Sequence, residues 1–162
     1  MNQEDAQSRD RIERIHVEEP ARIRLSPQVE HERRAALFDL VEDNRFRLRG
    51  FAQGPYTVYL GADGGSLRFD VRDREDVPLT RFTLPVQSLR ALIKDYFMVC
   101  DSYFKSIKTA SPSRIEAIDM GRRGLHNEGA ELLRERLADR VEMDLDTARR
   151  LFTLICVLQI RG

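Results

Sequence analysis

The sequence lacks a run of apolar residues long enough to cross a membrane. Its longest such run is LFTLICVLQI at 151 to 160, about half of the roughly 20 residues that a membrane-spanning helix needs. The N-terminal stretch MNQEDAQSRDR also lacks the apolar core of a signal peptide. We therefore expect a cytoplasmic protein with no membrane-bound part.

Cysteine and histidine are scarce, which argues against disulfide and metal chemistry. The two cysteines, Cys100 and Cys156, lie inside apolar helical patterns without CxxC spacing. We expect both to be reduced core residues. With only His16, His31 and His126 in addition, the sequence predicts neither a metal site nor a cofactor.

An excess of charge of either sign is also absent. The 162 residues include 27 basic and 27 acidic side chains, and this balance argues against binding to nucleic acid. Lysine is rare, because 24 of the basic residues are arginine. The planar guanidinium suits carboxylate and phosphate, although a GC-rich genome would produce the same bias. The length fits one domain over residues 1–162, with polar residues 1–10 frayed.

Periodicity in the first half of the chain predicts a strand, a helix and then a sheet. Alternation in RIERIHVEE is typical of a strand. Ser26 and Pro27 suit an N-cap and a first helical position, so we expect a helix from about 27 to 43. The stretches RFRLRGF, YTVYL, SLRFDVRD and LTRFTLP alternate with period two, and Asp63-Gly64 forms the turn of a hairpin.

These strands are expected to form an antiparallel sheet with one buried and one wet face. The apolar side chains that alternation places toward the core are Phe46, Leu48, Val58, Leu60, Leu67, Phe69 and Val71. The arginines that it places on the wet face are Arg45, Arg47, Arg49, Arg68 and Arg72. This arginine-rich face is a candidate surface for a partner.

Three helices are expected after the sheet. An apolar stripe at helical spacing consists of Val86, Leu89, Ile93, Tyr96, Phe97, Cys100, Phe104 and Ile107. Ser111 and Pro112 repeat the cap signal and begin a helix that extends to about 138, and Asp144 and Asp146 begin a central apolar helix. The predicted fold is α+β, with a small antiparallel sheet of four to five strands packed against an N-terminal helix and a three-helix C-terminal layer.

The stretch IDMGRRGLHNEG at 118 to 129 is the main candidate for function. Ile118, Leu125 and Leu132 are seven residues apart, so the helical phase continues through the glycines. Each glycine costs roughly 1 kcal/mol relative to alanine. Gly121 and Gly129 fall on or beside the apolar face, where we expect another element to approach closely.

The same helical phase places Arg122 toward the buried side, with Asp119 and His126 along the same edge. A partly buried arginine needs partners, because an unpaired charge in a core is costly. The favoured interpretation is a structural ion-pair network that ties this helix to the sheet. The alternative is a site for an anionic ligand, lined by Asp119, Arg122, Arg123, His126 and Asn127.

Other interpretations of this stretch are weaker. In a loop version, Gly121 ends one helix, Asn127 caps the next, and backbone N–H groups with the two arginines form an anion-binding nest. His126 could act as a phosphoacceptor, and HNEGAE does not match the HExxH pattern of metalloproteases. The serines have no GxSxG setting, and no P-loop is present.

Three stretches resemble an uncharacterised family of alphaproteobacterial proteins, numbered 0262 in the series of uncharacterised protein families. They are VEHERRAALFDLVEDNRF, SPSRIEAIDMGRRGLHNEGAELLRERL and DTARRLFTLICVL. The resemblance implies a bacterial cytoplasmic protein of about this length. It implies no activity, cofactor or catalytic residue.

Two classes of function follow from these patterns. The first is a non-enzymatic protein-binding or regulatory module that uses the arginine-rich sheet face and the polar edge of the helix at 112 to 138. The second is an enzyme or sensor for a small phosphate- or carboxylate-containing ligand. In the second, Arg122 and Arg123 hold the ligand, His126 is the acid or base, and Asp119 orients His126. The sequence predicts no oligomeric state.

Overall fold

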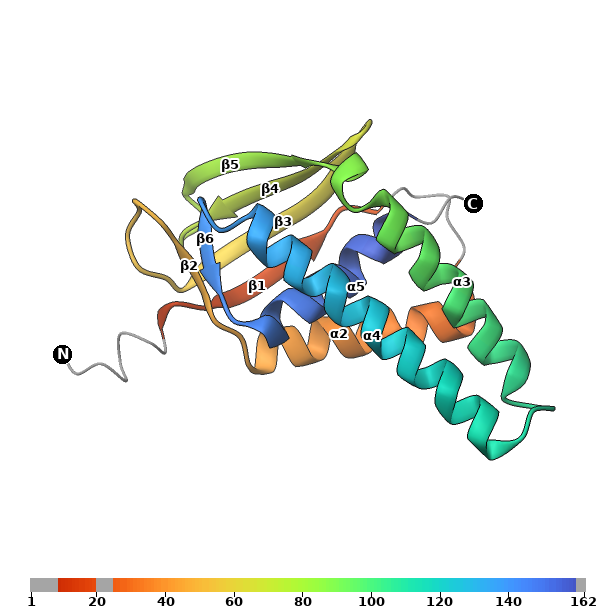
Figure 1. Ribbon diagram of the computed structural model, residues 1–162. Helices are drawn as coiled ribbons and strands as arrows, with labels where there is room; N and C mark the ends of the chain where they lie inside the picture. The colour runs from red at the N-terminus through yellow and green to blue at the C-terminus, as the bar shows by residue number, and fades with distance from the viewer. Residues whose placement is uncertain (1–8, 20–24, 160–162) are drawn as a thin grey trace.

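The computed structural model describes residues 9–19 and 25–159. The fraying expected for residues 1–10 falls mostly on residues 1–8, which lie outside the described residues, and Asp10 is buried. The elements follow one another as β1 (Ile12–Val17), α2 (Pro27–Glu42), β2 (Phe46–Leu48), β3 (Tyr56–Asp63), β4 (Ser66–Arg72), β5 (Pro78–Pro85), η1 (Val86–Ser88), α3 (Arg90–Ser106), α4 (Pro112–Arg136), β6 (Val141–Met143) and α5 (Leu145–Leu158) (Figure 1).

The main sheet is mixed, with strand order β1-β3-β4-β5. Strands β3, β4 and β5 form the expected antiparallel meander, whereas β1 pairs with β3 in parallel. The parallel pairing follows from the connection, because α2 crosses over between the two strands. Strand β2 leaves this sheet and pairs with β6 in a separate two-stranded sheet. The α+β class is confirmed.

The side chain of Asn44 joins β1 to the end of α2. Its Oδ1 accepts a hydrogen bond from the N–H of Ile12 at 2.7 Å, and its Nδ2 donates to the carbonyls of Ile12 and Leu40 at 2.9 and 2.6 Å. One carboxamide therefore satisfies backbone groups at the sheet edge and in the last turn of α2.

The caps expected from the sequence are present. The Ser26 hydroxyl accepts from the N–H of Val29, and the Ser111 hydroxyl accepts from the N–H of Arg114. The Asp144 carboxylate accepts from the N–H of Thr147 at 2.9 Å at the start of α5. These contacts satisfy N–H groups that have no partner inside their helices.

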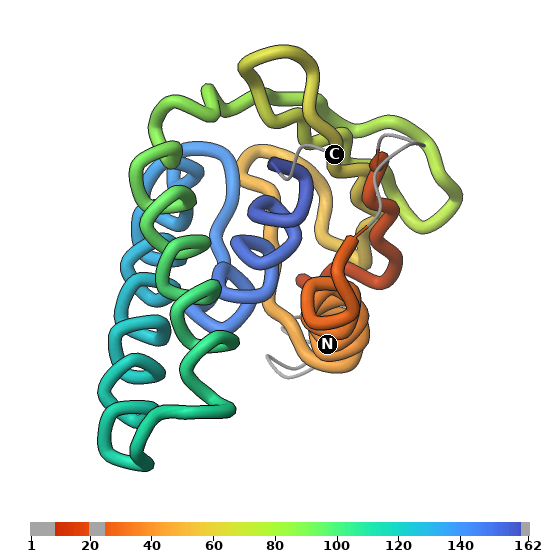
Figure 2. Tube along the Cα trace, turned by 90° about the vertical axis from the view of Figure 1, so that its right-hand side faces the viewer, coloured from red at the N-terminus to blue at the C-terminus, as the bar shows by residue number. Residues whose placement is uncertain are grey.

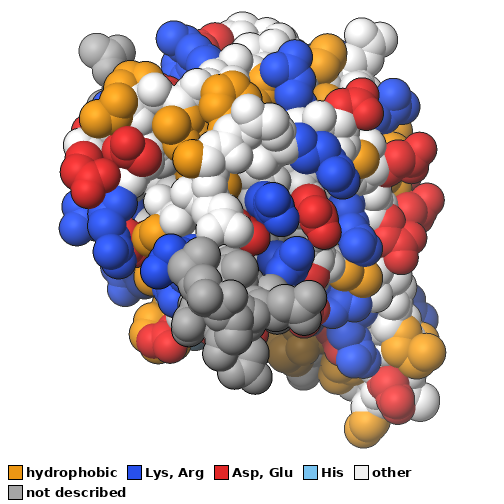
Figure 3. All heavy atoms as spheres, turned by 90° about the vertical axis from the view of Figure 1, so that its left-hand side faces the viewer, with side chains coloured by type: hydrophobic (Ala, Val, Ile, Leu, Met, Phe, Trp, Pro, Cys, Tyr) orange, Lys and Arg blue, Asp and Glu red, His pale blue; other side chains and the backbone are white. Residues whose placement is uncertain are grey.

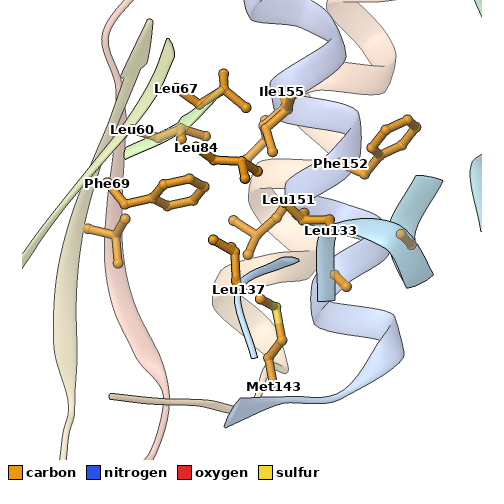
Figure 4. Close-up of a cluster of buried hydrophobic side chains, with 14 of the residues drawn as sticks. Leu60, Leu67, Phe69, Leu84, Leu133, Leu137, Met143, Leu151, Phe152 and Ile155 are labelled. Atoms are coloured by element: carbon orange, nitrogen blue, oxygen red, sulfur yellow. The ribbon is translucent and has the colours of Figure 1, made fainter. Parts of the chain in front are cut away.

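Helix α5 lies at the centre of the core, between the main sheet and the outer helices. Leu151 and Ile155 point toward Leu60, Leu67 and Phe69 of the sheet (Figure 4). Helices α2 and α4 pack on α5, and α3 runs beside α4 (Figures 1 and 2). The expectation of a central last helix is confirmed.

Other core predictions are also confirmed, with one exception. The seven apolar strand positions expected toward the core are all buried, as are Cys100 and Cys156, which are free thiols. Ile107 is the exception in the α3 stripe, because α3 ends at Ser106 and the Ile107 side chain is 49% exposed. Within the described residues, no helix is long and apolar enough to cross a membrane.

Candidate functional site

Residues 118–129 lie inside one continuous helix, α4. The loop version of this stretch, with its anion-binding nest, is therefore wrong. The interior of a helix has no free N–H groups to offer a ligand, because each one bonds to a carbonyl one turn earlier. Any ligand at this stretch must be held by side chains.

The close approach expected at the glycines occurs at Gly129 alone. A Cβ built on Gly129 would lie 2.6 Å from Cε1 and Cε2 of Phe152, so the ring of α5 occupies the space of a side chain. No atom lies within 4 Å of a Cβ built on Gly121 or Gly124. The packing role expected for Gly121 is wrong, because α4 exposes that position to solvent.

Arg122 and Asp119 form the ion pair that the sequence predicts. Nη2 and Nε of Arg122 lie 2.6 and 3.0 Å from Oδ1 of Asp119, and this bond lowers the pKa of the Asp119 carboxyl. The Arg122 guanidinium also reaches α2, where Nη1 lies 3.6 Å from Oε1 of Glu32, and it lies over the ring of Tyr103. The network ties α4 to α2 and α3, not to the sheet as expected.

Arg123 is less enclosed than Arg122. Its Nη2 lies 3.1 Å from Oδ2 of Asp119, and its side chain is 65% exposed against 25% for Arg122. One carboxylate therefore holds two guanidinium groups on one edge of α4.

His126 is a half-buried, neutral histidine bonded to α5. Its Nε2 lies 2.8 Å from Oγ1 of Thr153, which donates to the carbonyl of Arg149 at 3.3 Å. The Thr153 oxygen therefore accepts from Nε2–H, which leaves Nδ1 as an acceptor. Burial, together with the charges of Arg149 and Arg122, lowers the pKa of His126 to about 4.

Asn127 receives a hydrogen bond from α5. Nε of Arg149 donates to Oδ1 of Asn127 at 2.7 Å, and Nη1 of Arg149 donates to Asp146 at 2.8 Å. The next residue, Arg150, donates to the backbone carbonyl of Asp43 at the C-terminus of α2. Arginines of α5 therefore reach both neighbouring helices.

A cleft of about 860 Å³ is lined by residues of α2, α4 and α5, with Tyr96 of α3 also in its lining. We call it the α2–α4–α5 cleft, and its size is typical of a small-molecule site. Its lining residues are Glu32, Ala35, Ala36, Asp39, Tyr96, Glu116, Met120, Arg122, Arg123, Gly124, His126, Asn127, Arg149, Arg150 and Thr153.

The cleft contains most of the site residues expected from the sequence. Arg122, Arg123, His126 and Asn127 line it. Asp119 is not a lining residue, but it forms ion pairs with both Arg122 and Arg123. The sequence therefore located one wall of the cleft.

The sequence did not identify the residues of α2, α3 and α5 that form the other walls of the cleft. These residues are Glu32 and Asp39 of α2, Tyr96 of α3, and Arg149, Arg150 and Thr153 of α5. The three stretches that carry the family resemblance cover α2, α4 and α5. That shared coverage was the available signal for a site formed by the three helices together.

Two ionisable groups that line the cleft, Glu32 and Tyr96, have shifted pKa values. Burial raises the pKa of the Glu32 carboxyl, and the Arg122 charge opposes that rise. Burial also raises the pKa of the Tyr96 hydroxyl. Tyr96 therefore stays neutral at physiological pH and can serve only as an uncharged contact.

Two arginines expected on the wet face of the sheet, Arg68 and Arg72, are already paired. Arg68 binds Glu18 and Asp63, and a Cβ on Gly61 would meet its guanidinium, so the glycine lets Arg68 cross β3. Arg72 lies 3.1 Å from Asp70 and also pairs with Asp76.

The remaining arginines expected on that face lie elsewhere. Arg45 and Arg47 belong to or border β2, in the other sheet, and Arg49 donates to the carbonyl of Ala138. On the face shown in Figure 3, positive and negative side chains are interspersed. No strongly basic face results from the arginine-rich composition among the residues visible there.

Comparison with known proteins places the chain among relatives of no assigned function. The model of the uncharacterised protein family UPF0262 matches residues 9–161. A UPF0262 protein of Paramagnetospirillum magneticum is 53% identical over 95% of this chain and 98% of its own length. One from Rhodospirillum rubrum is 52% identical over the full length of both chains. No solved structure matches. The resemblance seen in the sequence is confirmed, and the chain belongs to the uncharacterised protein family UPF0262.

Proposed function

We propose that this protein binds a small molecule with a carboxylate or phosphate group in the α2–α4–α5 cleft. The observation that carries the proposal is that Arg122 and His126 line a hollow together with polar side chains from two other helices. A purely structural ion pair would lie beneath packed side chains. A concave site with a few converging polar groups is typical of ligand binding.

The arginines retain donors for such a ligand. Each guanidinium has five N–H donors, and the contacts of Arg123 and Arg149 use only part of them. The partner of Arg150 is an uncharged carbonyl, so its charge is not neutralised by that contact. Planar guanidinium groups bind carboxylate and phosphate through paired hydrogen bonds.

The geometry favours binding or sensing over catalysis. Asp119 bonds to Arg122 and His126 bonds to Thr153, so Asp119 does not orient His126 in the way an acid–base pair requires. A histidine with a pKa of about 4 is also a weak base at neutral pH. We therefore propose a ligand-binding protein that acts in the cytoplasm.

A protein-binding module is the second candidate. Phe38 of α2, Met98 of α3 and Met120 of α4 are large apolar side chains that are mostly exposed. Met120 also lines the cleft. Exposed apolar side chains of this size suit contact with a protein partner.

A thermal-shift screen tests the proposed function. We would measure the melting temperature with a panel of carboxylates and phosphates that includes amino acids and phosphorylated amines. We expect at least one compound to stabilise the wild type, by roughly 2 to 4 °C for each 1 kcal/mol of binding free energy.

The variant for this screen is Arg123→Gln with Arg150→Gln, and the control is Arg81→Gln, an exposed arginine of the sheet face. The double variant should lose the shift, and the control should keep it. The proposal is wrong if no compound shifts the wild type, or if the double variant responds equally.

A further inference from the structure

Acidic side chains share the cleft with the arginines. Four arginines line it, together with the carboxylates of Glu32 and Asp39 on α2 and Glu116 on α4. An anion that entered the cleft would be attracted by the first group and repelled by the second. The lining therefore suits a ligand that carries charge of both signs.

The pairing of these charges sharpens the argument. Glu32 has Arg122 at 3.6 Å, whereas Asp39 and Glu116 have no Lys, Arg or His within ion-pair distance among residues 9–19 and 25–159. Asp39 and Glu116 are both exposed to the cleft and to solvent. They are carboxylates whose charge is available to an incoming cation.

The basic charges are arranged differently. Arg122 and Arg123 are held by Asp119, and Arg149 by Asp146, and neither of these carboxylates lines the cleft. Arg122 also pairs with Glu32, which lines the cleft, whereas Arg123 and Arg149 have no carboxylate partner in the lining among the described residues and keep N–H donors for a ligand. Preorganised donors of this kind bind an anion without first losing an internal partner.

The acidic groups of α2 and the basic groups of α5 lie on different helices, and α4 contributes charge of both signs. Glu32 and Asp39 are seven residues apart on α2, so they lie on one face of that helix. Arg149 and Arg150 are on α5, and the remaining basic groups are on the middle of α4. Along α2 the cleft is acidic, and along α5 it is basic.

We propose that the ligand is zwitterionic: an amine whose ammonium group binds at Asp39 on α2 and whose carboxylate or phosphate binds the arginines of α4 and α5. This inference rests on the proposed function and narrows its ligand class. A simple anion would leave the carboxylates of the cleft without a partner, and a simple amine would leave the arginines without one. Charge of both signs in the site therefore selects against both kinds of ligand.

Isothermal titration calorimetry with matched compounds tests the inference. One set is γ-aminobutyrate, butyrate and butylamine, and the other is phosphoethanolamine, ethyl phosphate and ethanolamine. Each set holds a zwitterion, the same acid without its amine, and the amine without its acid. We expect the zwitterion of at least one set to bind roughly tenfold tighter, or more, than both of its partners.

Two substitutions on α2 accompany the titrations. Asp39→Asn should weaken binding of the zwitterion to the level of the acid alone and leave the acid itself unaffected or slightly tighter. Glu42→Gln, on the same helix but outside the cleft, should leave both unchanged. Asp39 is exposed, so its variant is expected to fold, which the melting temperature would verify.

The outcomes separate the two proposals. If the acid binds as tightly as the zwitterion, the zwitterionic ligand is wrong and the proposed anion binding stands. If the amine binds as tightly as the zwitterion, the arginines are not used and the proposed function fails as well. Absence of saturable binding by every compound contradicts both.

Discussion

At the scale of single residues, Arg122 fits both the structural and the ligand-binding interpretation of the helix edge formed by Asp119, Arg122 and His126. Its bond to Asp119 is the predicted structural ion pair, and its contact with Glu32 reaches across to α2 at one end of the cleft. Sequence periodicity could place Arg122 beside Asp119, because both lie on one helix. It could not identify Glu32, which is far away in the chain and comes close only in the fold.

Arg122→Ala should therefore lower stability. The substitution leaves the partly buried Glu32 without its cation and removes two hydrogen bonds to Asp119. We expect a loss of about 1–2 kcal/mol, which corresponds to a melting temperature lower by roughly 2 to 8 °C. Arg123→Ala is the control and should change little, because that side chain is mostly exposed. An unchanged melting temperature for Arg122→Ala would rule out the structural role.

The glycines of α4 offer a second test at this scale. Gly129→Ala would force a Cβ into the ring of Phe152, and we expect a loss of about 1–3 kcal/mol from overpacking. Gly121→Ala meets open space and should gain roughly 0.5–1 kcal/mol from helix propensity. Urea unfolding of the two variants measures both. A loss of stability for Gly129→Ala and a gain for Gly121→Ala support the described packing. Equal gains in stability for both variants would contradict it.

His126 predicts a dependence of stability on pH. Its pKa is about 4 in the folded protein and 6.5 when unperturbed, so between these values the unfolded chain binds a proton that the folded chain does not. The contribution of the neutral His126 to the free energy of unfolding is therefore complete above pH 6.5 and is lost as the pH falls toward 4.

Over that window the wild type should lose about 2–3 kcal/mol more than His126→Gln. Urea unfolding at several pH values from about 7 to 4 measures the difference. Parallel pH profiles for the two proteins would mean that His126 titrates as an exposed histidine.

At the scale of elements, local signals predicted the helices well and the strand pairing less well. Ser26, Ser111 and Asp144 form the expected caps because a cap depends on residues within one turn. The pairing of β2 with β6 depends on two three-residue strands that are distant in the chain. Alternation in RFRLRGF identified β2 as a strand but did not show its pairing partner, so the sequence placed β2 in the main sheet.

The link between β1 and α2 can be tested through Asn44. Asn44→Asp keeps the acceptor for the Ile12 N–H but replaces the donor to the Ile12 and Leu40 carbonyls with a charged oxygen. We expect a loss of about 2–3 kcal/mol in the free energy of unfolding. Equal stability of the variant and the wild type would show that this bridge contributes nothing.

At the scale of the whole molecule, the cleft exists only because α2, α4 and α5 come together from distant parts of the chain. The sequence identified Arg122 and Arg123 of α4 and gave an anionic ligand as the alternative to a structural ion-pair network. It could not show that Glu32 and Asp39 of α2 line the same cleft as these arginines. The apolar pattern of a helix indicates which of its faces is buried, but not which other helix lies beside it. The acidic side of the site follows from tertiary structure alone.

The most direct test is to identify what the protein carries in cells. Wild type and an Asp39→Asn, Arg150→Gln variant would be expressed in an alphaproteobacterial host, purified and denatured, and the released small molecules compared by mass spectrometry. A compound with both an amino and an acidic group should be enriched roughly tenfold or more with the wild type and lost from the variant. The same small molecules in equal amounts from both proteins would contradict the account.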